Sequence, residues 1–61
     1  MIKIKKINNV EIVVNSDLIE TIETNPDTTI TMTTGRKIIS NETVDDIINK
    51  VIAYKRTIYT K

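Results

Sequence analysis

The stretch NPDTTITMTTGRK, residues 25–37, is the part of this sequence that decides the fold. It begins with a turn signal, because Pro26 fixes φ at the first central position of a β-turn. Apolar residues then alternate with threonines, so Ile30 and Met32 share one face of a predicted strand. Gly35 ends the strand, since glycine adopts positive φ without a steric cost. The stretch therefore predicts a strand between two turns.

The threonines of this stretch occupy the other face of the strand. Thr31-Met32-Thr33 is a Thr-x-Thr unit, and regular arrays of such units resemble ice-binding surfaces. One strand is not an array, and β-branched polar residues are common on solvent-facing strands. We therefore expect these threonines to meet water or a neighbouring subunit.

Two strands joined as a hairpin are predicted at the N-terminus. The turn is expected at Asn8-Asn9, because Asn tolerates positive φ better than most residues. Alternation then assigns the apolar positions to an inner face, with Ile2 and Ile4 on the first strand and Val10, Ile12 and Val14 on the second.

The segment LIETIET, residues 18–24, is ambiguous between a short helix from Ser16 and a strand. Its β-branched residues suit a pleat, so we favour a brief turn through Leu18 followed by a strand. Beyond the central stretch, residues 36–40 are predicted to return as the last strand.

The clearest element is an amphipathic helix near the C-terminus. Thr43 and Asp46 have the spacing of a capping box, with Asp in place of the usual Glu or Gln. Apolar positions then recur at i, i+3, i+4, i+7 and i+8, namely Val44, Ile47, Ile48, Val51 and Ile52. The sequence thus predicts an α+β fold, a small antiparallel β-sheet of four to five strands with one C-terminal amphipathic helix, in a single domain spanning residues 1–61.

Size and composition limit how such a domain can be stabilised. A chain of 61 residues is close to the lower limit for folding alone. It has no Cys and no His, which excludes disulfides, thiolate nucleophiles and the usual zinc sites. With 13 Ile, 5 Val and 10 Thr, nearly half of the residues are β-branched, so the core must be aliphatic. Oligomerisation or unusually dense aliphatic packing remains as the source of support.

No catalytic, metal-binding or cofactor-binding residues are expected, and no small-molecule substrate. Asp45 and Asp46 are adjacent, but neighbours on a helix do not face each other, and their place in the first turn already explains them. No loop has the ligand spacing of a calcium site. We therefore expect that the chain is not an enzyme.

The charge balance argues against nucleic acid as a partner. The net charge is +1, whereas nucleic-acid-binding domains carry a strongly basic balance or face. The charges are segregated, since residues 11–27 hold five acids and no base. An alternative function, a small regulatory or nucleic-acid-binding module, would use Lys3, Lys5 and Lys6. No apolar run approaches the roughly 18 residues of a membrane span, so we expect a cytoplasmic protein that does not span the membrane.

The end of the predicted helix is the candidate interface. It mixes Tyr, Arg and Ile, which are favoured in or near interface cores. The candidate residues are Tyr54, Lys55, Arg56, Ile58 and Tyr59. The sequence leaves open the alternative that Tyr54 and Ile58 only complete the core. An interface here would suit a homo-oligomer or a protein partner.

Several segments, in this order and at this spacing, resemble the small flagellar FlbD family, which includes swarming motility proteins. They are MIKI at residues 1–4, LIETIE at 18–23, PDTTIT at 26–31, TTGRK at 33–37 and VIAYKR at 51–56. The sequence departs from the family at Asn9, where members commonly carry Gly, although Asn can also adopt positive φ.

The resemblance implies an accessory role in flagellar motility and swarming, in support of the power delivered by the motor. The implied partners are flagellar motor or stator components, at the inner face of the membrane near the flagellar base. The resemblance supplies no catalytic or ligand-binding residues.

Overall fold

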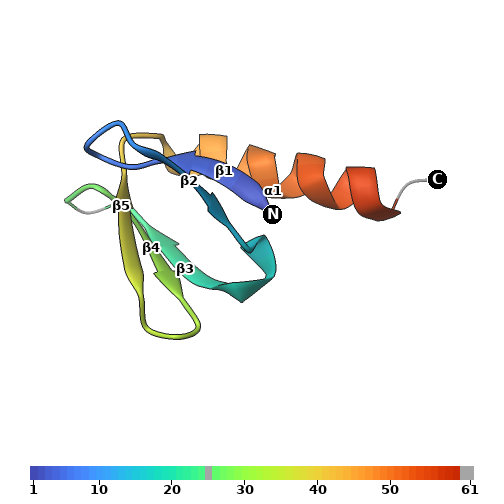
Figure 1. Cartoon of the computed structure of the whole chain (residues 1–61), viewed down its shortest axis with the longest axis horizontal. Coiled ribbons are helices and arrows are strands. Elements are labelled where there is room, and N and C mark those ends of the chain that lie inside the picture. The colour runs from blue at the N-terminus through green and yellow to red at the C-terminus, as the bar shows by residue number, and fades with distance from the viewer. Residues whose placement is uncertain (25, 60–61) are drawn as a thin grey trace.

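Five short strands and one long helix make up the part of the chain that the computed structural model describes, residues 1–24 and 26–59 with side chains up to Thr57 (Figure 1). The strands are β1 (Ile2–Lys5), β2 (Glu11–Val14), β3 (Ile19–Glu23), β4 (Thr28–Met32) and β5 (Lys37–Ser40). A short 3-10 helix, η1 (Ser16–Leu18), separates β2 from β3, and the helix α1 spans Val44–Tyr59. The predicted α+β class is confirmed.

The strands form two sheets, so the prediction of a single sheet was wrong. β1 pairs antiparallel with β2, and β3, β4 and β5 form a separate antiparallel sheet. The two sheets meet at a single bridge between Lys6 and Ser40, beside which the N–H of Ile7 donates to the carbonyl of Ile39 at 2.9 Å. Beyond this bridge β1 and β5 diverge (Figure 1). The divergence lets the two sheets enclose a core, which one small flat sheet could not do.

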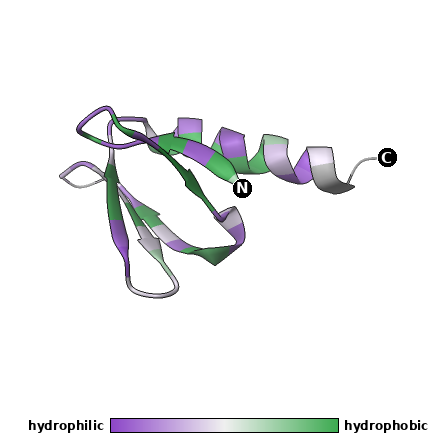
Figure 2. Cartoon of the chain, viewed as in Figure 1, coloured by the Kyte–Doolittle hydropathy of each residue, from purple (hydrophilic) through white to green (hydrophobic). Residues whose placement is uncertain are grey.

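The hydrophobic core lies where the two sheets and α1 converge. Ile4, Ile30 and Ile47 are fully buried, one each from β1, β4 and α1. The buried set is completed by Ile2, Val14, Met32 and Ile38. Figure 2 shows the hydrophobic positions along β1, β2 and α1, around this convergence. Burying one Ile side chain contributes about 1.5–3 kcal/mol to stability. The aliphatic core expected from the composition therefore holds the two sheets and α1 together.

The loop between β4 and β5 confirms the expected role of Gly35. The N–H of Gly35 donates to the carbonyl of Met32 at 2.9 Å, and the N–H of Met32 donates to the carbonyl of Arg36 at 2.8 Å. Gly35 has a φ of 91°. A turn followed by a residue with positive φ is the common three-residue hairpin loop.

The loop between β1 and β2 has the same geometry. The N–H of Asn9 donates to the carbonyl of Lys6 at 2.8 Å, and Asn9 has a φ of 68°. The positive φ expected near Asn9 is confirmed, but the loop has three residues, 7–9, rather than two. Val10 consequently precedes β2 and is 51% exposed, so its predicted place on the inner face was wrong.

The turns on either side of β3 lie where the sequence predicts them. Before it, the side chain of Asn15 accepts a hydrogen bond from the N–H of Asp17 at 3.0 Å and caps η1, so the favoured turn-then-strand interpretation of residues 18–24 is confirmed. After it, Pro26 and Asp27 bend the chain into β4. Asn25, with which this turn was predicted to begin, lies outside the described residues.

A β-bulge turns two isoleucines of β3 towards the interior. Between Ile19 and Thr21 the pairing advances by two residues on β3 but by one on β4, so Glu20 is an extra residue. An extra residue shifts the alternation of a strand. As a result, Ile19 and Ile22, three residues apart, are both half-buried.

The helix begins with the predicted capping box, but its apolar face is only partly buried. The hydroxyl of Thr43 accepts from the N–H of Asp46 at 3.1 Å, and the carboxylate of Asp46 accepts from the N–H of Thr43 at 3.3 Å. Ile47 is fully buried, whereas Ile48 is 42% and Ile52 44% exposed. Part of the predicted apolar stripe therefore faces away from the core.

Replacing Gly35 by Ala should lower the free energy of unfolding by about 1 kcal/mol, because an L residue is strained at positive φ. A Cβ at this position would meet no described atom within 4 Å, so the backbone conformation alone causes the loss. Urea unfolding would measure it, with Gly35→Asn as the control, since Asn tolerates positive φ. Equal stability of the Gly and Ala forms would contradict the assigned conformation.

Candidate functional site

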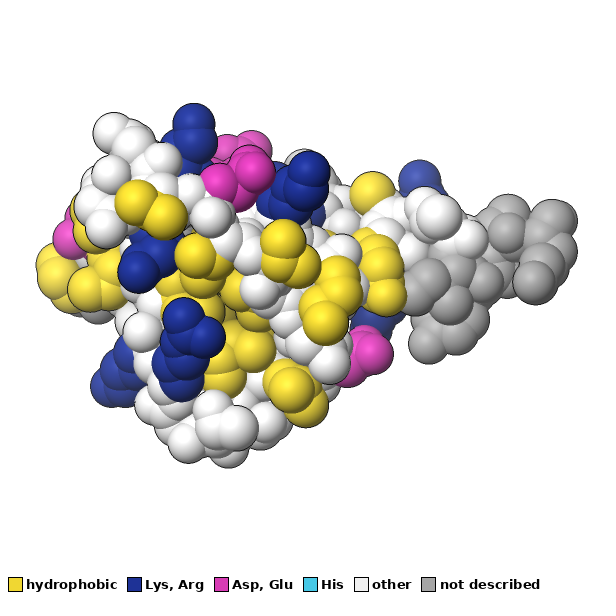
Figure 3. Space-filling view, viewed as in Figure 1, with side chains coloured by type: hydrophobic (Ala, Val, Ile, Leu, Met, Phe, Trp, Pro, Cys, Tyr) yellow, Lys and Arg dark blue, Asp and Glu magenta, His cyan; other side chains and the backbone are white. Residues whose placement is uncertain are grey.

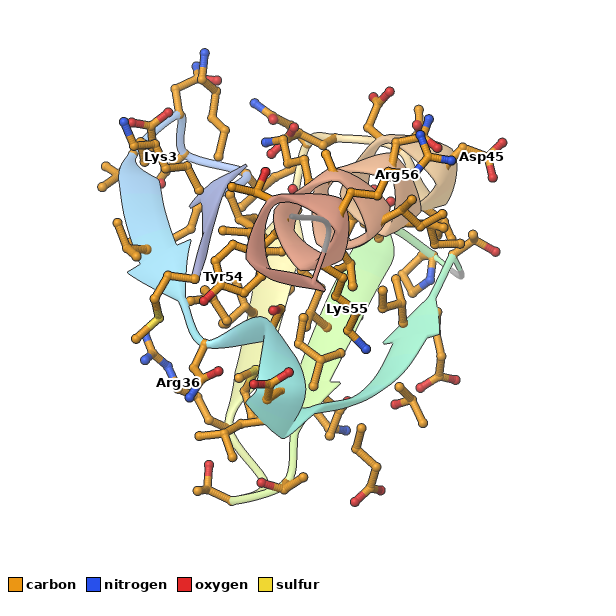
Figure 4. The ribbon with its side chains drawn as sticks, turned by 90° about the vertical axis from the view of Figure 1, so that its right-hand side faces the viewer. Lys3, Arg36, Asp45, Tyr54, Lys55 and Arg56 are labelled. Carbon is orange, nitrogen blue, oxygen red and sulfur yellow. The ribbon has the colours of Figure 1, made fainter. Side chains whose placement is uncertain are left out.

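The C-terminal half of α1 carries the residues predicted as an interface. Tyr54 is half-buried and packs against the core, as the alternative interpretation expected. Lys55 and Arg56 are exposed and leave the helix in different directions (Figure 4). The side chains of Ile58 and Tyr59 lie outside the described residues. An interface at these five positions stays a prediction.

An aliphatic groove of about 260 Å³ lies between α1 and β3. The residues that line it are Ser16, Ile19, Ile22, Ile48, Val51, Ile52 and Lys55. Two features create it: the bulge turns the isoleucines of β3 inwards, and α1 leaves two of its own isoleucines uncovered. Among the predicted interface residues whose side chains are described, Lys55 alone lines this groove.

The hydroxyl of Ser16 is an unsatisfied polar atom in this groove. Ser16 is 7% exposed, and its Oγ has no hydrogen-bond partner among the described residues. A buried hydroxyl without a partner lowers stability, because the group loses its hydrogen bonds to water. The groove thus combines uncovered aliphatic side chains with a polar atom that a partner could satisfy.

A second apolar hollow, of about 310 Å³, lies on the other side of α1. It is lined by Met1, Ile2, Lys3, Lys50, Ala53 and Tyr54. Figure 3 shows hydrophobic side chains gathered on this face where the helix meets the strands. Apolar hollows therefore flank α1 on both sides.

A polar cluster centred on Glu42 ties α1 to β1. The carboxylate of Glu42 accepts from the N–H of Lys5 at 2.8 Å and forms an ion pair with Lys50. Lys50 also donates to the carbonyl of Lys3 at 2.6 Å. Ser40 donates to the carbonyl of Lys5 at 2.7 Å and accepts from the N–H of Glu42 at 3.0 Å. These bonds make the cluster a structural joint between α1 and the first strand.

The pKa of Glu42 reflects this cluster. Burial by itself would raise the pKa of the carboxyl, and so does the charge of Asp46. The hydrogen bond from Lys50, the N–H of Lys5 and the charge of Lys50 outweigh both and hold the pKa below its ordinary value of 4.5. The ionised form of Glu42 is therefore the one that stabilises the fold.

The lysines of the first hairpin do not share one face. Lys3 and Lys5 are exposed and lie opposite Val13 and Glu11. Lys6 is half-buried at the bridge to β5. A continuous basic surface, which the nucleic-acid alternative requires, is not formed by these three residues.

Metal clusters and membrane-spanning helices are both absent from the described part of the chain. No group of three Asp or Glu side chains lies close enough together there to hold a metal ion. Within the same residues, no helix has both the length and the apolar character needed to cross a membrane.

The match to known proteins is to one family. A model of the FlbD family, described as flagellar and swarming motility proteins, matches residues 1–59. No curated protein and no solved structure matches the chain significantly. The family match spans every described strand and helix, and the resemblance seen in the sequence is confirmed.

Replacing Glu42 by Gln should lower the free energy of unfolding at pH 7 by about 1 kcal/mol, because the amide keeps an acceptor for Lys5 but loses the charge that Lys50 requires. The pKa of Glu42 is lowered in the folded state. Its contribution to the free energy of unfolding is therefore present above pH 4.5 and is lost as the pH falls through its folded-state pKa. The difference between the two proteins should therefore shrink below pH 4.5 in denaturant titrations. A difference that stays constant at acidic pH would contradict this.

Replacing Ser16 by Ala should raise the free energy of unfolding by about 1 kcal/mol, since it removes a buried hydroxyl that has no partner. Ser40 supplies the control, because it is also buried but makes two hydrogen bonds. Ser40→Ala should lower stability by about 1–2 kcal/mol. Thermal unfolding of both variants would measure the contrast, and a loss of stability in Ser16→Ala would show that its hydroxyl is satisfied.

Proposed function

Because the chain belongs to the FlbD family of flagellar and swarming motility proteins, we propose that it is a non-enzymatic accessory protein of bacterial flagellar motility. In this proposal it supports the power of the flagellar motor through protein contacts. The observation that carries the proposal is the family match over residues 1–59.

The chemistry of the side chains supports action by contact. Two carboxylates near α1 are engaged in structural roles, Glu42 with Lys50 and Asp46 with the N–H of Thr43. The chain has no His and no Cys to serve as a general base or nucleophile. A protein with these side chains would act on the flagellar motor by binding to it.

The uncovered face of α1 supports the same proposal. Exposed isoleucines rimmed by polar residues are typical of surfaces that a partner covers. Ile48 and Ile52 lie one turn apart beside the aliphatic groove. We propose cytoplasmic motor or stator components as the partners, at the inner face of the membrane near the flagellar base.

A deletion strain tests the proposal. We expect cells without this protein to assemble flagella but to swarm more slowly, with reduced torque in a tethered-bead assay at high load. Expression of the wild-type chain in trans should restore both measurements. Normal swarming and normal torque in the deletion strain would overturn the proposal.

Variants on the contact surface sharpen the test. Ile52→Asp should fail to restore torque, because it places a charge on the proposed contact face. Thr57→Asp adds the same charge in the next turn of α1 and should restore torque in full. Circular dichroism of the purified proteins should show that both variants fold. Full restoration by Ile52→Asp would move the contact away from this face.

A further inference from the structure

We propose that this chain forms a twofold-symmetric dimer, in which the exposed face of α1 packs antiparallel on the same face of a second copy. The inference concerns the chain itself. Because the dimer buries the face proposed above for a motor partner, the dimer would have to dissociate before that partner binds. It rests on the order of charged and apolar residues along this face.

The contact face is a single stripe along α1. Asp45, Ile48, Ile52 and Arg56 are separated by three, four and four residues, which places them on one side of a helix. All four are exposed. Figure 4, which looks along the helix, shows Asp45 and Arg56 on the same side of α1, away from Lys3 and Tyr54. At 1.5 Å per residue the stripe is roughly 16 Å long.

The stripe is complementary to itself when reversed. It runs from an acid through two isoleucines to a base, so an antiparallel copy aligned about residue 50 places Ile48 beside Ile52 of the other chain. The same alignment places Asp45 beside Arg56 of the second copy, and symmetry repeats this ion pair at the other end. A twofold contact of this kind is closed and stops at the dimer.

Two other arrangements of two copies are disfavoured by charge. A parallel alignment would place Asp45 on Asp45 and Arg56 on Arg56, and like charges in contact are destabilising. Pairing through the free edge of β3 would bring together the exposed Glu20 and Glu23 of both copies. Charged side chains on an edge strand protect it from such pairing. The antiparallel contact through α1 avoids both of these repulsions.

The neighbouring groove extends the contact beyond one helix. Ile48 and Ile52 form part of its lining, so the isoleucines of the opposing helix would lie at its mouth. The other wall is formed by Ile19 and Ile22 of β3, which are half-buried in the single chain. Covering these four side chains removes aliphatic surface from water, which supplies the driving force.

The size of the contact predicts a weak dimer. The chain exposes 4362 Å², and a stable interface buries about 800 Å² per partner, close to a fifth of this surface. A stripe of three helical turns with part of one groove covers less. We therefore expect a dimer that dissociates on dilution, with a Kd of about 10 μM to about 1 mM.

Sedimentation equilibrium over this concentration range is the first test. The wild-type chain should pass from monomer to dimer, with no higher species. Ile48→Asp should abolish dimer formation, because it leaves a buried charge at the centre of the contact. Thr57→Asp, which adds a charge to the same helix off the stripe, should dimerise like the wild type.

A charge exchange tests the antiparallel alignment. Asp45→Arg and Arg56→Asp should each weaken dimerisation by about tenfold, because each variant turns two attractive pairs into two repulsive ones. An equimolar mixture of the two variants should recover association, since each chain then meets an opposite charge at both ends. The mixture also controls for folding, because misfolded variants would not recover.

Three results would overturn the proposal. One is a wild-type chain that stays monomeric at the highest concentration. Another is a dimer that Ile48→Asp leaves intact, which would place the contact elsewhere. The third is a mixture of the charge variants that associates no better than either alone, which would exclude the antiparallel alignment.

Discussion

The short junction where β1 meets the end of β5 is the interaction on which the rest of the structure depends. Both backbone groups of Lys5 are used there: its N–H donates to Glu42 at 2.8 Å, and its carbonyl accepts from the hydroxyl of Ser40 at 2.7 Å and from the N–H of Asn41 at 3.3 Å. These bonds hold two small sheets at an angle, and the ion pair from Glu42 to Lys50 places α1 across the opening between them. Neither sheet alone could cover its hydrophobic face.

The same placement decides which part of α1 remains uncovered. The apolar positions of the helix span a wider arc than the space between the two sheets can hold. Ile47 fills that space, while Ile48 and Ile52 lie on the flank that faces β3 and solvent. The candidate surface is thus a direct result of packing a broad helical face into a narrow opening. One end of that surface is acidic, at Asp45, and the other is basic, at Arg56.

The features predicted correctly from the sequence are those that depend on residues close together in the chain. The capping box at Thr43, the positive φ of Gly35 and the turn before β3 depend on contacts only a few residues apart, and all were confirmed. The division into two sheets depends on residues about 35 apart, such as Lys5 and Ser40, which no local pattern can reveal. The exposed isoleucines were missed for a similar reason, because periodicity locates a helical face without showing how much of it the sheets cover. The bulge at Glu20 likewise has no local signal.

The junction also sets the order in which the chain can fold. All three hairpins join residues close in sequence, and such structures form within about 1–10 μs. The bonds between Lys5 and the segment from Ser40 to Glu42 close a loop of more than thirty residues, which carries a larger entropic cost. The helix has no complete surface to pack on until that loop closes. The formation of the contact between β1 and β5 should therefore limit the rate of folding. The two loops with positive φ should affect mainly the hairpins, which form before that contact.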